Sequence, residues 1–208
     1  MKAVEIISAE VLPKFEKLEP YHSSLSSDWF GQSFSPPAHY LFGMDRDHLH
    51  FFASRNSHAV IHPESRPGEF QAELWKYDVA EFFLRAPDSN HYLEFNLAPN
   101  GGWWSCLFKE TLVPVEENNP PLPGVIASGE VAPDSWNAHA KIPLSFLREH
   151  LDFSPEWSDV FGSEDHDGAI WIGIVNSADR RNAEAGFVDR IRRGNGDISS
   201  VNLRERLI

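Results

Sequence analysis

Polar side chains that could bind a ligand alternate with apolar ones along two neighbouring segments of the sequence. Glu81 and Arg85 lie in residues 78–85, and Glu94 lies in residues 91–97. A period of two is typical of a β-strand that presents one apolar and one polar face. Carboxylate, guanidinium, amide and phenol groups on one face could form hydrogen bonds to a polar ligand. The candidate ligand-binding residues in this region are Trp75, Glu81, Arg85, Tyr92, Glu94 and Asn96.

The residues between these two segments predict a hairpin. Residues 87–90 read Pro-Asp-Ser-Asn, and each of these residue types favours a turn, through a fixed φ or through local side-chain hydrogen bonds. Residues 100–102, Asn-Gly-Gly, predict a second reversal that leads into a third strand. A symmetric first turn would set three pairs opposite one another: Arg85 with Tyr92, Phe83 with Glu94, and Glu81 with Asn96.

Two motifs in this hairpin resemble the core of the family 9 carbohydrate-binding modules, which belong to the DOMON-like group of β-sandwiches. The first motif is Trp-x-x-Asp-x-x-Glu-x-Phe-Leu over residues 75–84, and the second is Tyr-Leu-Glu-Phe-Asn-x-x-Pro-x-Gly over residues 92–101. The resemblance implies an all-β fold of two packed antiparallel sheets, of the jelly-roll or immunoglobulin-like kind, with long loops. It also implies non-catalytic binding of a saccharide or a similar polyhydroxy ligand.

In family 9 modules, two tryptophans clamp the end sugar of a chain while polar side chains bind its hydroxyl groups. Trp75 and Glu81 match the positions of the family's first tryptophan and of a hydroxyl-binding glutamate. The second tryptophan follows a late central strand, and the corresponding loop here, which begins at Asn176, contains no aromatic residue. Asn176 could still form hydrogen bonds to a ligand, and Trp103 or Phe187 could replace the missing tryptophan.

Two other functions remain open at the level of sequence. A glycoside hydrolase on the same scaffold would use two carboxylates across a pocket, such as Glu81 and Glu94. A haem-binding protein of the DOMON-like group would use methionine and histidine ligands, and Met44 with any of the ten histidines could supply them. His48 and His50 share one strand face, as two zinc ligands would, but the sequence shows no third ligand at a usable spacing.

Structural calcium is common in the modules that the motifs resemble. Hard oxygen ligands on turns suit Ca²⁺, and two acidic turns offer them here. The spacing matches no complete calcium-binding loop, so the alternative is that these turns are simply solvated. The calcium candidates are Asp45, Asp47, Asp165 and Asp167.

Length, charge and targeting signals limit the classes of partner and compartment. The 208 residues fit one all-β domain over residues 1–208, and a formal net charge of −13 disfavours binding to nucleic acid or to an anionic membrane. Residues 1–19 have no apolar segment of signal-peptide length, and no stretch approaches the roughly 20 apolar residues of a membrane helix. Cys106 is the only cysteine, which excludes an internal disulfide. These features predict a cytoplasmic protein.

The rest of the chain predicts further strands, a helical turn and one long polar connection. The strongest apolar run, residues 169–176, predicts a central strand. Residues 55–74 form the polar connection, and its length favours a functional role. Residues 145–150 predict the helical turn. The other predicted strands cover residues 3–12, 38–44, 48–54, 104–109, 125–131, 136–142 and 198–203.

Overall fold

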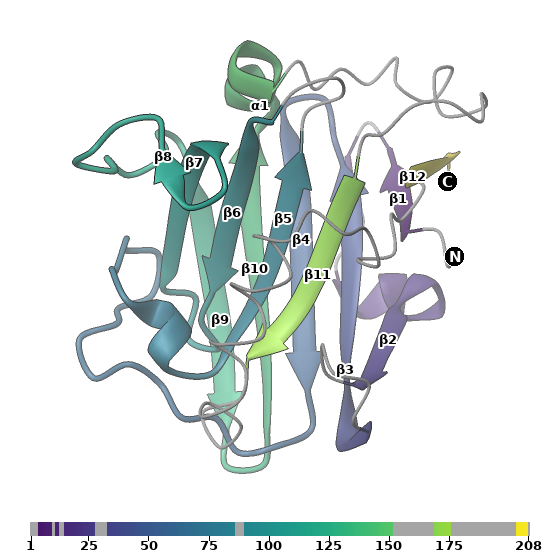
Figure 1. The fold of residues 1–208 in the computed structure, drawn as a ribbon. Helices are drawn as coiled ribbons and strands as arrows, with labels where there is room; N and C mark the ends of the chain where they lie inside the picture. The colour runs from purple at the N-terminus through teal and green to yellow at the C-terminus, as the bar shows by residue number, and fades with distance from the viewer. Residues whose placement is uncertain are drawn as a thin grey trace.

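The described residues of the protein form two β-sheets packed face to face, with a helix at one end, as Figure 1 shows. An all-β sandwich is what the sequence predicts, and this prediction is confirmed. Within the described ranges, no helix is both long enough and apolar enough to span a membrane. The computed structural model describes residues 4–9, 11–12, 15–27, 33–85, 90–151, 169–175 and 203–207.

One sheet, which we call the five-stranded sheet, contains the predicted hairpin. The order of its described strands is β11 (Ala169–Val175), β5 (Val79–Arg85), β6 (Tyr92–Leu97), β7 (Trp103–Glu110) and β8 (Val113–Pro114), and neighbouring strands are antiparallel. The register of β5 and β6 agrees with the prediction at every pair: Arg85 lies opposite Tyr92, Phe83 opposite Glu94, and Glu81 opposite Asn96.

The other sheet, which we call the seven-stranded sheet, departs from the prediction of purely antiparallel pairing. β1 pairs in parallel with both β3 and β12. A parallel pair needs a long crossover connection, and the chain between β1 and β3, which contains η1 (Phe15–Tyr21), supplies one. The described strands run in the order β12 (Leu203–Leu207), β1 (Val4–Ser8), β3 (Ser33–Met44), β4 (His48–Arg55), β10 (Ser135–Pro143) and β9 (Ile126–Ala132), with β2 (Ser23–Ser27) paired to β3.

Aromatic side chains fill the space between the sheets. Phe51 of β4 packs edge-on against Phe82 of β5 with ring centres 5.0 Å apart, and Phe82 stacks on Phe95 of β6 at 5.5 Å. These rings and that of Phe42 are fully buried. Burial of a side chain of this size stabilises the fold by about 1.5–3 kcal/mol. The core therefore fixes the β5–β6 hairpin against the opposite sheet.

The helix α1 (Leu144–Leu151) directly follows β10 and lies over one end of the sandwich, at the top of Figure 1. Leu144, Leu147 and Leu151 are buried, and their spacing of three and four residues places them on one face of the helix. The predicted helical turn, residues 145–150, is confirmed to within one residue at each end.

The turn between β6 and β7 brings the two sheets into contact. Gly101 has a φ of +84°, in the left-handed region that favours glycine. A Cβ atom at Gly101 would overlap the backbone of Ser128, and a Cβ atom at Gly129 would overlap the backbone of the turn at Pro99. Ser128 and Gly129 belong to β9. Two glycines therefore allow this turn to touch a strand of the seven-stranded sheet.

One prediction about strands differs from the structure, and another lies almost entirely outside the described residues. Most of the apolar run predicted at residues 169–176 forms β11 (Ala169–Val175), but among the described strands β11 lies at the end of its sheet and not at the centre. A continuous apolar run indicates that both faces of a strand are covered, and this does not require a partner strand on both edges. The predicted closing strand at 198–203 falls almost entirely outside the described residues, and β12 begins at Leu203.

Candidate functional site

Glu81, Glu94 and Asn96 lie on the outer face of the five-stranded sheet, as their spacing predicts. Asn96 lies opposite Glu81 on one side and opposite Trp104 of β7 on the other. Alternate residues of the same strands, such as Phe82, point into the core between the sheets. The neighbours of the three polar residues form a separate apolar cluster that contains Val79, Phe83, Tyr92, Trp104, Cys106 and Phe108. This face is therefore mixed and not wholly polar.

Trp75 lies beside this face, near the end of the long connection between β4 and β5. It belongs to η2 (Leu74–Lys76), in which Leu74 is fully buried and anchors the segment. The ring of Trp75 is partly exposed and packs edge-on against Trp104, with ring centres 4.8 Å apart. An indole that solvent can reach thus borders the sheet face that carries the polar residues.

Trp104, and not Trp103, is the second tryptophan on this face. Trp103 is 5% exposed and points the other way, where its ring stacks on Phe95 and its Nε1 donates a hydrogen bond to the Gly68 carbonyl at 3.1 Å. The prediction that Trp103 could replace the missing clamp tryptophan is therefore wrong. Sequence reasoning missed Trp104, although strand alternation from Asn96 across the second turn could have identified it.

The two glutamates of this face differ in their exposure to water, because Glu81 is buried whereas Glu94 is partly exposed. Glu81 is 6% exposed, and burial, followed by the nearby Glu94 carboxylate, raises its pKa to about 8. Burial also raises the pKa of Glu94 to about 7, while a hydrogen bond from Asn96 acts in the opposite direction. The expectation of a polar face is therefore wrong in part, because Glu81 and the fully buried Asn96 lie among mostly apolar side chains.

Asn96 connects the polar groups of this face. Its Nδ2 donates a hydrogen bond to Glu94 Oε1 at 3.0 Å, which orients the carboxylate. Its Oδ1 is buried and accepts no hydrogen bond from the part of the chain that the structure describes. Glu81, which lies opposite on β5, carries an O–H donor when it is protonated. A hydroxyl group of a ligand is a second kind of donor that could satisfy this oxygen.

Arg85 and Tyr92 lie opposite each other at the β5–β6 turn, and they differ in how accessible their side chains are to a ligand. Arg85 is partly exposed. Tyr92 is 8% exposed, its ring stacks on Phe108 at 4.8 Å, and its hydroxyl oxygen accepts a hydrogen bond from the Leu112 N–H at 3.1 Å. Burial is the main cause that raises the pKa of Tyr92 to about 12. Tyr92 therefore holds the β7–β8 turn, and Arg85 is the more accessible of the two.

Side chains on the outer face of the seven-stranded sheet could hold a metal ion. Asp45 follows β3, and its Oδ1 accepts hydrogen bonds from the backbone N–H groups of Asp47 and His48 at 2.8 and 2.7 Å. Its Oδ2 lies 2.8 Å from His50 Nε2. Candidate ligand atoms of Asp45, His48 and His50 lie within 4.8 Å of one another. The turn thus supplies a third ligand for the two histidines, which the sequence did not reveal.

Calcium at this turn stays a prediction. Asp47 is not part of the cluster, and the side-chain atoms near Asp45 are imidazole nitrogens, whereas Ca²⁺ prefers oxygen ligands. Met44, the candidate haem ligand, is buried between the sheets, so its side chain does not face the histidines of the outer face. Four predicted site residues lie outside the described ranges: Asn176, Phe187, Asp165 and Asp167.

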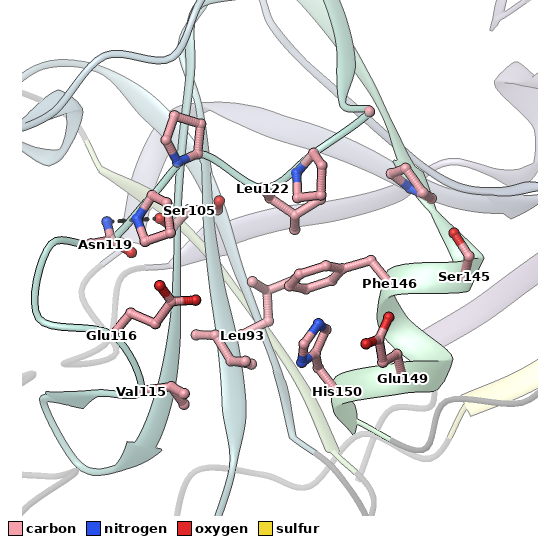
Figure 2. Close-up of a pocket in the computed structure, with 16 residues that line it drawn as sticks. Leu93, Ser105, Val115, Glu116, Asn119, Leu122, Ser145, Phe146, Glu149 and His150 are labelled. Carbon is pink, nitrogen blue, oxygen red and sulfur yellow. Dashed lines mark hydrogen bonds between the residues drawn. The ribbon is translucent and has the colours of Figure 1, made fainter.

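A pocket of about 480 Å³ lies at the end of the sandwich, between α1, the proline-rich loop before β9, and strands β6 and β7 (Figure 2). Leu93, Leu107 and the ring of Phe146 form part of its apolar wall, and Glu116 and Glu149 lie on opposite sides of it. Of the predicted ligand-binding residues that the structure describes, none lines this pocket. It is therefore a second place where a small molecule could bind.

Comparison with known proteins identifies the fold. No family model and no curated protein matches the sequence. Among solved structures, the chain is similar to a "putative carbohydrate-binding protein" from Bacteroides uniformis ATCC 8492, with a TM-score of 0.50 and 16% identity over 82% of this chain and 83% of that chain. The chain shares this fold. The resemblance inferred from the hairpin motifs is thus confirmed at the level of the fold.

Two further matches belong to the family that the motifs resemble. They are structures of a family 9 carbohydrate-binding module from Caldicellulosiruptor kristjanssonii, in complex with glucose and with cellotriose. The TM-scores are 0.45 and 0.46, each with 12% identity, over 68% and 69% of this chain and 69% and 68% of those chains. TM-scores below 0.5 do not decide which ligand this chain binds.

Proposed function

We propose that the outer face of β5, β6 and β7 beside Trp75 binds a saccharide without catalysing a reaction. The observation that carries the proposal is the contact between the partly exposed ring of Trp75 and Trp104, on the face that also bears Glu94 and Asn96. The C–H face of a sugar ring stacks on an indole, while its hydroxyl groups need fixed hydrogen-bond partners. This face offers both kinds of partner next to each other.

The contacts divide the residues into two layers. The upper layer consists of the partly exposed residues Trp75, Glu94 and Arg85, which contact the ligand directly. The indole of Trp75 stacks on the sugar ring, and the carboxylate of Glu94 and the guanidinium of Arg85 bind its hydroxyl groups. Trp104 and Asn96 are buried beneath them and hold Trp75 and Glu94 in place. Glu81 lies in this lower layer, opposite Asn96 in the register of β5 and β6.

The fold agrees with this proposal by analogy. The similar protein from Bacteroides uniformis is described as carbohydrate-binding, and the hairpin motifs resemble a family that binds saccharides. One fold can serve many functions, so the proposal depends on the site itself.

Binding to a glycan array, followed by calorimetric titration of the best oligosaccharide, tests the proposal. Trp75→Ala should weaken binding about fivefold or more, because an aromatic stacking contact contributes about 1 kcal/mol beyond the area it buries. Glu94→Gln should weaken binding while retaining the hydrogen bond that the side-chain oxygen accepts from Asn96.

Phe146→Ala provides the matched control, because Phe146 is also a partly exposed aromatic residue but lines the pocket at the end of the sandwich. We expect this variant to bind like the wild type. Equal binding by the wild type and Trp75→Ala would refute the assigned site, and loss of binding in Phe146→Ala alone would move the site to the pocket.

A second candidate function is hydrolysis of a glycoside, and the raised pKa values of Glu81 and Glu94 favour it. A glycosidase needs one carboxyl group that stays protonated to act as a general acid beside a second carboxylate. Incubation with nitrophenyl glycosides and oligosaccharides, with Glu81→Gln and Glu94→Gln as controls, separates the two functions. Turnover that both variants lose would establish the enzyme, and the binding function predicts none in the wild type.

A further inference from the structure

We propose that Asp45, His48 and His50 bind a divalent transition-metal ion of the zinc class, at a site on the opposite sheet from the proposed saccharide site. Carboxylate oxygen and imidazole nitrogen are ligands that Zn²⁺ accepts, and the candidate ligand atoms lie within 4.8 Å of one another. Three protein ligands leave a fourth position of a tetrahedral ion open for water or another ligand.

The local structure brings the three ligands together in a defined way. The turn after β3 is held by two backbone hydrogen bonds to Asp45 Oδ1, from Asp47 and His48. His48 and His50 are two residues apart on β4, so their rings project from the same face of the strand. The second carboxylate oxygen, Oδ2, already lies 2.8 Å from His50 Nε2. Little rearrangement is needed to place an ion among them.

A third histidine, on the neighbouring strand, provides the outer support that metal-binding histidines usually have. His139 of β10 places its Nε2 at 3.0 Å from His50 Nδ1, the ring nitrogen that faces away from Asp45. The His139 ring also stacks on Phe52 with ring centres 3.9 Å apart, so its position is fixed by packing. In a metal-bound state, His50 would donate its Nδ1–H to His139, which selects the tautomer whose Nε2 faces the ion.

The charges around the cluster act on the affinity for a cation in opposite directions. Asp45 is the anionic ligand, and Lys141 lies opposite His50 in the register of β4 and β10. Lys141 repels a cation, so replacing it with a neutral side chain of similar length should strengthen binding. Because two ligands are nitrogen atoms, the site should prefer Zn²⁺ or Co²⁺ to Ca²⁺.

Calorimetric titration of the full chain, free of any affinity tag and stripped with a chelator, tests the site with Zn²⁺ and with Ca²⁺. We expect one Zn²⁺ per chain and no Ca²⁺ binding at these residues. Asp45→Asn keeps an oxygen that can accept the two backbone hydrogen bonds of the turn but removes the charge. His48→Ala removes a partly exposed ring and should not disturb the core. Each variant should weaken Zn²⁺ binding at least about tenfold.

Three further variants sharpen the test. Lys141→Met should bind Zn²⁺ more tightly, and His139→Asn should weaken binding about tenfold and change the visible spectrum of the Co²⁺-loaded protein. His58→Ala is the matched control, because His58 follows the far end of β4, where its ring bonds to the Pro133 carbonyl. The proposal would be overturned if both Asp45→Asn and His48→Ala bound Zn²⁺ as tightly as the wild type. It would also be overturned if the wild type bound Ca²⁺ and Asp45→Asn abolished that binding.

Discussion

The buried carboxyl group of Glu81 should make the stability of the protein fall as the pH rises from 5 to 8. The folded protein holds the proton of Glu81 up to a pKa of about 8, whereas the unfolded chain releases it near 4.5. Between these values the native state binds more protons than the unfolded state, so the free energy of unfolding decreases with pH. The stabilising contribution is fully present below pH 4.5 and is lost as the pH rises through 8.

The magnitude follows from the two pKa values. Moving the pKa of one carboxyl group from 4.5 to about 8 corresponds to a loss of roughly 3 kcal/mol between pH 5 and pH 8. Glu94, with a pKa raised to about 7, adds to the loss in the same direction. A loss of this size is a large part of the 5–15 kcal/mol that typically separates folded from unfolded proteins.

Glu81→Gln removes the titrating group and keeps the shape of the side chain. The variant should match the wild type within about 1 kcal/mol at pH 5 and exceed its stability by roughly 3 kcal/mol at pH 8. Urea unfolding followed by tryptophan fluorescence at pH 5, 6, 7 and 8 measures the difference. Glu110→Gln, at an exposed position of β7, should leave the pH profile of the wild type unchanged. An identical pH profile for Glu81→Gln and the wild type would show that Glu81 is not held protonated in the native state.

Two further substitutions test how the face is supported. Gly101→Ala should destabilise the protein by about 2 kcal/mol or more in urea unfolding, because the new Cβ would overlap the backbone of Ser128. Gly68 is the control position, with a similar φ of +76°. A Cβ there meets only the Ala127 carbonyl oxygen, at 3.3 Å, so Gly68→Ala should cost less stability. Equal losses for the two variants would show that the φ angle and not the contact with β9 matters. Tyr92→Phe should cost about 1 kcal/mol of stability, since the Leu112 N–H loses its acceptor, and it should leave saccharide affinity unchanged in calorimetry. A loss of affinity without a loss of stability would instead place the Tyr92 hydroxyl in contact with the ligand.

The hairpin at the centre of the fold could be predicted because its information is local. Alternation of side chains with a period of two, and four turn-forming residues between the strands, gave the register at all three pairs. A local pattern of the same kind predicted both strands around Asp45, whereas the helical turn of α1 was predicted from a helix-start signal and the family resemblance. The alternation also predicted that Glu81 and Glu94 share one face, which the cluster around them bears out.

Strand position within a sheet and the burial of the polar face could not be predicted, because both depend on residues that are distant in sequence. The apolar run of β11 reads as a central strand, yet which strands pair along its two edges is set by the whole topology. Glu81 alternates like a solvent-facing residue, but it lies between Asn96 of β6 and Gly173 of β11 and is only 6% exposed, on a face that it shares with an apolar cluster.

The sequence by itself determined the class of fold, the β5–β6 register and the side of the sheet on which the polar residues lie, since periodicity and turn chemistry act over a few residues. The tertiary structure alone decided that Trp104 contacts Trp75, that Trp103 faces the core, and that His139 reaches His50 across 89 positions of sequence. Those contacts arise where strands from different parts of the chain lie side by side, and no local pattern specifies which strands will do so.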